Sequence, residues 1–240
     1  MTSSASFRAI IFDFGGTLAD IVPTHQWLFL RACEEMGVAV DPHRIYDAES
    51  VGWEPYLTPL GPAHPEASVS GAAFAHFKTA LLRERLAAAG IQADPDLLWR
   101  TAARVYELDT DPDMYHLYDD VLPALDTLRS RGVAMSILSN HEWELPKLVY
   151  GLGLTPYMAS VVTSARVGFR KPHPRMFQEA FADLGVAPGE ALMVGDSVSA
   201  DIRGAEGVGM PGVFIQRNPG RSLPDGVRTI QSLAELVDFL

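Results

Sequence analysis

The chain has 240 residues, of which 48% are hydrophobic and 20% charged, so it can bury one core together with a smaller lobe. Its formal net charge of −11 repels nucleic acid phosphates and anionic membranes, so we expect neither as a partner. The apolar runs are too short to span a bilayer, residues 1–6 do not resemble a signal peptide, and Cys33 has no second cysteine to pair with, so the expected compartment is the cytoplasm.

Short apolar runs along the chain predict buried strands. They span residues 7–14, 132–139, 159–163, 191–195 and 212–215. Amphipathic patterns predict helices at 123–131, 175–184, 201–206 and 233–240. Strands that alternate with helices and are apolar throughout favour an α/β fold with a parallel sheet covered on both faces.

Residues from about 24 to 111 break this alternation. Thr24, Ser70 and the Asp94-Pro95 pair each predict the start of a helix, and no strand pattern lies between them. A proline-rich stretch at 53–65 predicts a long irregular loop. The segment therefore indicates an all-helical insert after the first strand.

The ends of the predicted strands carry the chemically active residues. Asp13 closes the first strand, Ser139 and Asn140 close the second, and Asp196 follows the fourth. Lys171 lies between the third and fourth strands, just before a predicted helix. Ligands bind outside the carboxyl ends of the strands in an open parallel sheet, so we expect these groups at one edge.

These groups suit phosphoryl transfer. Asp13 and Asp196 offer carboxylate oxygens to a hard cation such as Mg²⁺, and the Gly15 carbonyl is a third candidate ligand. Ser139 and nearby backbone N–H groups can donate to phosphate oxygens, while Lys171 supplies a positive charge. A carboxylate beside a cation can attack phosphorus and form an aspartyl-phosphate that water hydrolyses.

Taken in chain order, four motifs resemble those of the haloacid dehalogenase (HAD) superfamily, most of whose members are phosphatases and other phosphotransferases. The motifs are Asp13-Phe14-Gly15-Gly16-Thr17, Ser139-Asn140, Lys171-Pro172 and Gly195-Asp196-Ser197-Val198-Ser199-Ala200-Asp201. The resemblance covers almost the whole chain. It implies a Rossmann-like three-layer core from residues 1–20 and 112–240, and a small helical cap domain from residues 21–111.

The resemblance also implies roles for individual residues and a small phosphorylated substrate. Asp13 would be the nucleophile, and Mg²⁺ would bind Asp13, the Gly15 carbonyl and Asp196. The phosphoryl group would contact Gly16, Thr17, Ser139, Asn140 and Lys171. Asp201 would orient Lys171 or a metal-bound water.

One position departs from the phosphatase pattern. Phosphatases of this family usually carry an acid–base aspartate two residues after the nucleophile, where this chain has Gly15. Such a group typically contributes ~10²–10⁴-fold to the rate. The chain therefore acts on substrates with good leaving groups, takes an acid–base group from elsewhere, or binds phosphate ligands without useful turnover. The candidate replacements are His141, Asp20 and His25.

Two alternatives to a phosphatase remain open. The loss of the acid–base side chain at Gly15 suits a phosphate-binding or regulatory protein that kept the fold. A 2-haloacid dehalogenase would use the same aspartate without Mg²⁺, with a cap arginine such as Arg44. Against it, those enzymes usually have a tyrosine where Gly15 stands, and the Asp196 and Asp201 pair resembles the metal-binding form. The sequence leaves the substrate and the oligomeric state open.

Overall fold

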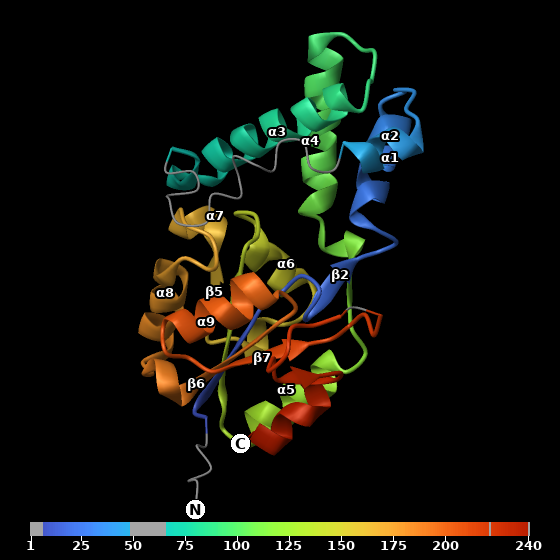
Figure 1. The fold of residues 1–240 in the computed structure, drawn as a ribbon. Coiled ribbons are helices and arrows are strands. Elements are labelled where there is room, and N and C mark those ends of the chain that lie inside the picture. The colour runs from blue at the N-terminus through green and yellow to red at the C-terminus, as the bar shows by residue number, and fades with distance from the viewer. Residues whose placement is uncertain (1–6, 49–65, 221, 240) are drawn as a thin grey trace, which may run out of the picture.

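A computed structural model of the chain describes residues 7–48, 66–220 and 222–239. The predicted loop at 53–65 and residues 1–6 lie outside these ranges. Two lobes make up the fold: a lower lobe built around a sheet and an upper lobe of helices (Figure 1). Within the described ranges, no helix combines the length and the hydropathy needed to cross a bilayer.

The lower lobe contains a parallel sheet, which confirms the predicted α/β class. Its strands, in spatial order, are β5 (Ser160–Thr163), β4 (Ala134–Ser139), β1 (Ala9–Phe12), β6 (Ala191–Gly195), β7 (Gly212–Ile215) and β8 (Thr229–Ile230). All neighbouring pairs in this order are parallel. The first strand of the chain is therefore central, and the strands on its two sides end beside it.

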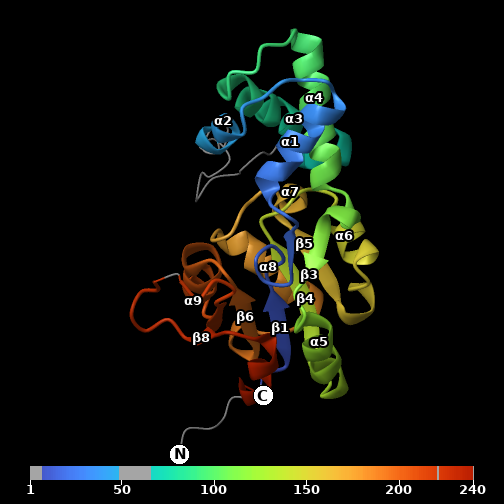
Figure 2. The same cartoon turned by 90° about the vertical axis from the view of Figure 1, so that its right-hand side faces the viewer.

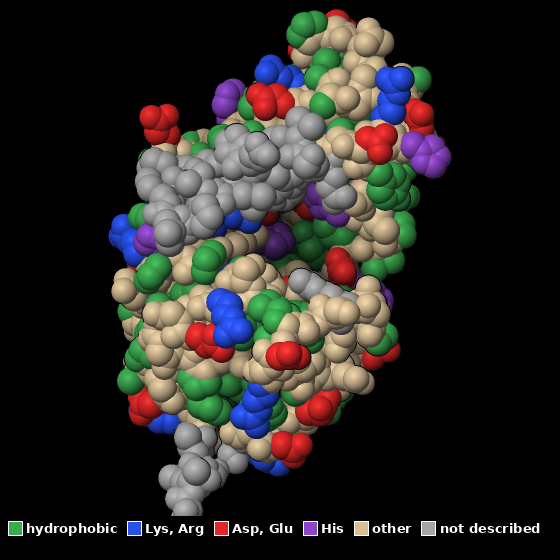
Figure 3. All heavy atoms as spheres, in the orientation of Figure 1, with side chains coloured by type: hydrophobic (Ala, Val, Ile, Leu, Met, Phe, Trp, Pro, Cys, Tyr) green, Lys and Arg blue, Asp and Glu red, His purple; other side chains and the backbone are tan. Residues whose placement is uncertain are grey.

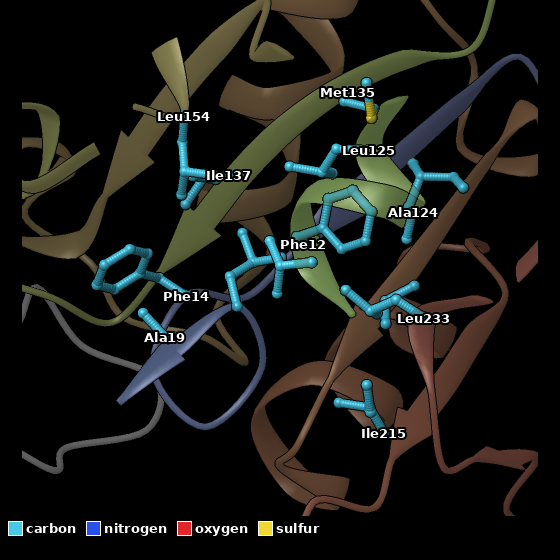
Figure 4. Packing of buried hydrophobic residues seen from close by; sticks show 14 of the residues in the cluster. Phe12, Phe14, Ala19, Ala124, Leu125, Met135, Ile137, Leu154, Ile215 and Leu233 are labelled. Atoms are coloured by element: carbon cyan, nitrogen blue, oxygen red, sulfur yellow. The ribbon is translucent and has the colours of Figure 1, made fainter. Parts of the chain in front are cut away.

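Helices cover both faces of this sheet, giving the three layers (Figure 2). One face packs on α5 (Val121–Ser130), α6 (Leu145–Gly151) and the helical turns of η7 (Leu233–Phe239), and the other on α8 (Pro174–Leu184) and α9 (Arg203–Gly207). Successive β1 side chains point to opposite faces, so Phe12 joins the first cluster and Ile11 the second. Figure 4 shows Phe12 in the first cluster, with Leu125 of α5 and Ile137 of β4.

The upper lobe is the predicted helical insert. It contains α1 (His25–Glu35), α2 (Pro42–Asp47), the 3₁₀ turn η2 (Ala67–Val69), α3 (Gly71–Ala88) and α4 (Pro95–Asp109). Three predicted N-caps are confirmed, because side-chain oxygens of Thr24, Ser70 and Asp94 accept backbone N–H groups of the first helical turns. These helices share a hydrophobic cluster that includes Phe29, Phe74 and Val105.

Some elements are too short to have a readable period in the sequence. An antiparallel pair of strands, β2 (Ala19–Ile21) and β3 (Tyr115–Leu117), joins the lobes, and η3 (Pro112–Met114) precedes β3. The other short elements are α7 (Ser164–Val167), η4 (Thr155–Tyr157), η5 (Pro188–Glu190) and a π-helical turn, η6 (Val198–Ile202), before α9. The predicted domain boundaries at 20/21 and 111/112 lie in or beside the β2–β3 connection and remain a prediction.

Candidate active site

Three motifs meet because β1 pairs with both β4 and β6. Phe12 is in register with Ile137 on one side and Val194 on the other, so the residues just beyond these positions share one sheet edge. A cavity of about 490 Å³ lies there. Its lining residues are Asp13, Gly15, Ser139, Asn140, His141, Arg170, Lys171, Pro172, Ser197, Ser199, Ala200 and Asp201. Figure 3 shows the surface hollowed between the two lobes.

The Lys171 ammonium is held at the floor of this cavity. Its Nζ lies 2.7 Å from Asp13 Oδ1, 2.7 Å from Asp201 Oδ1 and 2.6 Å from the Leu138 carbonyl oxygen. Burial lowers the pKa of Lys171, but the Asp13 and Asp201 charges outweigh it and raise the pKa above its ordinary value. The lysine is therefore charged and fixes the Asp13 carboxylate.

Asn140 fixes the backbone of this lysine. The Lys171 N–H donates to Asn140 Oδ1 at 2.7 Å, and Asn140 Nδ2 donates to the Lys171 carbonyl at 2.9 Å. Ser139, at the end of β4, is buried and lines the same cavity. The Ser139-Asn140 and Lys171-Pro172 motifs are thus hydrogen-bonded to each other through the side-chain oxygen and nitrogen of Asn140.

Three carboxylates, that of Asp13 among them, gather at this edge of the sheet. Asp13, Asp196 and Asp201 each place an oxygen within 4.8 Å of the others. Asp196 packs against the glycine turn, since a Cβ on Gly16 would lie 2.5 Å from its Oδ2. Burial raises the pKa of Asp201 to about 6 although Lys171 opposes the rise, and the Asp13 charge adds to it. Oxygen donors alone, next to a turn without side chains, fit a hard divalent cation.

Gly15 leaves open space in the cavity wall. A Cβ built on Gly15 would meet no atom within 4 Å. By contrast, Gly16 has φ of +67° and its Cβ would collide with Asp196. The two adjacent glycines therefore differ: the backbone requires Gly16, whereas position 15 has room for a side chain.

Of the three candidate acid–base residues, His141 is the one the structure brings to the cavity lining. Its Nδ1 accepts the Glu142 backbone N–H at 2.9 Å, and its Nε2 lies 3.3 Å from the Tyr115 hydroxyl. Both ring nitrogens are thus occupied within the protein. His25 lies 3.6 Å from Asp109 in the cap and does not line the cavity.

Asp20 lies in a neighbouring cavity of about 330 Å³, which Gly16 and Asp196 also line. There its Oδ2 accepts the Tyr118 hydroxyl at 3.3 Å. Thr17 is fully buried outside the lining of the larger cavity, and its carbonyl accepts N–H groups of Arg217. The acid–base role of Asp20 and the phosphoryl contacts of Thr17 and Gly16 stay predictions.

Sequence reasoning missed a buried ionic cluster where the cap meets the core. Lys78 of α3 forms a buried ion pair with Glu142, which follows His141. Burial alone would raise the pKa of Glu142, but its ion pair with Lys78 and the nearby positive charge of Arg170 lower it to about 2. Burial and the Glu142 charge raise the pKa of Asp109, at the end of α4, to about 6. Lys78 falls midway in the i, i+4, i+8 stripe from Phe74 to Leu82, a signal present in the sequence.

Comparison with known proteins agrees with this architecture. The family model of haloacid dehalogenase-like hydrolases matches residues 7–209. The chain is 40% identical over 220 residues to the glyceraldehyde 3-phosphate phosphatase of Methanopyrus kandleri, covering 88% of this chain and 84% of the relative.

Solved structures give the same result. A HAD phosphatase from Thermococcus onnurineus superimposes with a TM-score of 0.63 at 26% identity, covering 96% of both chains. A 2-haloacid dehalogenase from Pseudomonas syringae pv. Tomato gives 0.69 at 22% identity over 97% of both chains, a likeness of fold alone. The chain therefore belongs to the haloacid dehalogenase-like hydrolase family and is a hydrolase.

Proposed function

We propose that this hydrolase is a Mg²⁺-dependent phosphatase that cleaves a small phosphorylated metabolite through an aspartyl-phosphate on Asp13. The observation that carries the proposal is the Asp13 carboxylate, held 2.7 Å from Lys171 in a cavity that Ser139 and Asp201 also line. The phosphatase at 40% identity supports the same reaction class.

The metal would be held by Asp13, the Gly15 carbonyl and Asp196. The close grouping of the three carboxylates and the packing of Asp196 against Gly16 support this ligand set. Both oxygens of Asp201 are engaged, Oδ1 by Lys171 at 2.7 Å and Oδ2 by the Ser197 N–H at 2.9 Å, which favours its assignment as an orienting residue over a direct ligand. Bound Mg²⁺ would supply positive charge to the transferring phosphoryl group.

The protein side chains would act in two steps. In the first, an Asp13 carboxylate oxygen attacks phosphorus, the bond to the leaving oxygen breaks, and the leaving group departs as an anion that is protonated in solvent where its basicity requires it. In the second, water attacks the aspartyl-phosphate, the bond between phosphorus and Asp13 breaks, and phosphate leaves with a proton released to solvent. Ser139 and Lys171 would hold the phosphoryl oxygens throughout.

The open position at Gly15 limits the substrates. Without a carboxyl group there, the leaving oxygen must depart with little protonation. Acyl phosphates, aryl phosphates and sugar 1-phosphates release stable leaving groups and suit this site. Esters of simple alcohols should react slowly.

The test is a panel of phosphate compounds assayed with and without Mg²⁺. We expect phosphate release from acetyl phosphate and p-nitrophenyl phosphate to require Mg²⁺ and to disappear in Asp13→Asn. If the wild type and Asp13→Asn are equally inactive across the panel, the assignment of this protein as a phosphatase fails.

A second candidate is a phosphate-binding or regulatory role, and Gly15 is the observation that favours it. In that case beryllofluoride or phosphate with Mg²⁺ would raise the melting temperature while no phosphate compound turns over. The dehalogenase alternative has weaker support. Arg44 is exposed in α2 with its guanidinium against Gly90, and it does not line the cavity.

A further inference from the structure

Arg170 is a cationic side chain that the proposed mechanism leaves unused. It lines the same cavity as Asp13 and directly precedes Lys171. Its carbonyl accepts the His173 N–H at 2.7 Å, and the next peptide N–H is bound to Asn140. The backbone at Arg170 is therefore fixed relative to the Ser139–Asn140 pair, as a ligand-binding group should be.

The charges already placed around the nucleophile do not favour a phosphate dianion. Lys171 is neutralised by two carboxylates at 2.7 Å, Asp13 and Asp201, and Asp196 adds a further negative charge nearby. A bound Mg²⁺ would cancel the remaining excess. The metal, the lysine and the three carboxylates together would then offer the incoming dianion no net positive charge. One further positive charge within a few Å of the dianion would attract it strongly in such a buried site.

Arg170 can supply that charge while keeping its own protein contact. Its positive charge is one of those that lower the pKa of the buried Glu142. Glu142 is already paired with Lys78, so that carboxylate does not depend on Arg170 for its counter-charge. A guanidinium has five N–H donors in a planar fork, so it can serve a carboxylate and a phosphoryl group together.

We propose that Arg170 is a catalytic residue that binds the non-bridging oxygens of the phosphoryl group as it passes from the substrate to Asp13 and from Asp13 to water. The inference rests on the proposed function. Arg170 makes and breaks no covalent bond and transfers no proton. It donates hydrogen bonds to oxygens on which charge is redistributed during transfer.

The experiment compares Arg170→Gln with Arg175→Gln, a matched control at an exposed position of α8 that does not line the cavity. The substrates are p-nitrophenyl phosphate, acetyl phosphate and 4-carboxyphenyl phosphate, which share the phosphoryl group and a good leaving group and differ in the remainder. We expect kcat/KM to fall by about 10²-fold for all substrates alike in Arg170→Gln. Inhibition by inorganic phosphate should weaken by about tenfold, and Arg170→Lys should recover part of both losses.

Three results would overturn the inference. A loss confined to 4-carboxyphenyl phosphate would assign Arg170 to the substrate's carboxylate, and an unchanged kcat/KM and phosphate inhibition would remove it from the site. The third result is an Arg170→Gln variant with a lower melting temperature whose folded fraction is still inhibited by phosphate as strongly as the wild type; this would show a structural role only. If the wild type hydrolyses none of these compounds, the proposed function fails. If the wild type is active and Arg170→Gln is equally active, the inference fails and the proposed function stands.

Discussion

Placing a carboxyl group at position 15 tests the account of the missing proton donor. Gly15→Asp is sterically allowed, because its Cβ would meet no atom within 4 Å and its backbone is outside the left-handed region. The new carboxyl group would lie in the cavity that contains Asp13. General acid–base catalysis is worth ~10²–10⁴-fold, and we expect the lower end because the open space around the new Cβ leaves the side chain loosely packed.

The assay compares leaving groups. With glycerol 3-phosphate, whose leaving alkoxide needs a proton, kcat/KM should rise by about 10²-fold. With acetyl phosphate, the rate of phosphoenzyme formation should change by less than about threefold, because its leaving group departs unprotonated. Gly16→Ala is the matched control, and it should lose activity because its Cβ would lie 2.5 Å from Asp196 Oδ2. Equal gains for both substrates, or no gain for glycerol 3-phosphate in an enzyme that still cleaves acetyl phosphate, would refute the reasoning.

Further predictions concern the buried charges. Lys171→Met should lower kcat by at least ~10²-fold and the free energy of unfolding by about 3 kcal/mol in urea titrations, because it leaves the carboxylates of Asp13 and Asp201 without their cation. Lys78→Met should lower the free energy of unfolding by about 3 kcal/mol, because it leaves the buried Glu142 carboxylate without its cation. The double variant Lys78→Met/Glu142→Gln should lose less, and a double variant no more stable than Lys78→Met would contradict this. Since the folded pKa of Asp109 is raised from 3.8 to about 6, the folded state binds the proton more tightly, and stability should fall as pH rises from about 4 to 6. Asp109→Asn should make the free energy of unfolding less dependent on pH and raise it by about 1–3 kcal/mol at pH 7, as measured by urea unfolding at each pH.

The sheet and the main cap helices could be predicted because their signals are local. The apolar run around β1 and the N-caps at Thr24, Ser70 and Asp94 read directly from neighbouring residues. The meeting of Asp13, Ser139 and Asp196 followed from the rule that parallel strands bring their carboxyl ends to one edge. No such rule predicts a three-residue strand such as β2, which depends on its partner across the lobe boundary.

The ionic cluster at the cap could not be assembled from the sequence. Lys78 and Glu142 are 64 residues apart, and Asp109 belongs to a third segment, so only the docking of the cap on the core brings them together. The unoccupied volume beside Gly15 is also a tertiary property. A glycine in a turn predicts backbone freedom, whereas the structure distinguishes the open side of Gly15 from the Asp196 contact of Gly16.

The central claim is that Asp13 carries the phosphoryl group during turnover. The most direct measurement is mass spectrometry of the Asp13 peptide after acid quench of the enzyme turning over acetyl phosphate with Mg²⁺. The account predicts a phosphoryl adduct on Asp13 that forms before phosphate release, needs Mg²⁺ and is absent in Asp13→Asn. Sustained phosphate release by Asp13→Asn, or turnover with no adduct on Asp13 at any quench time, would contradict it.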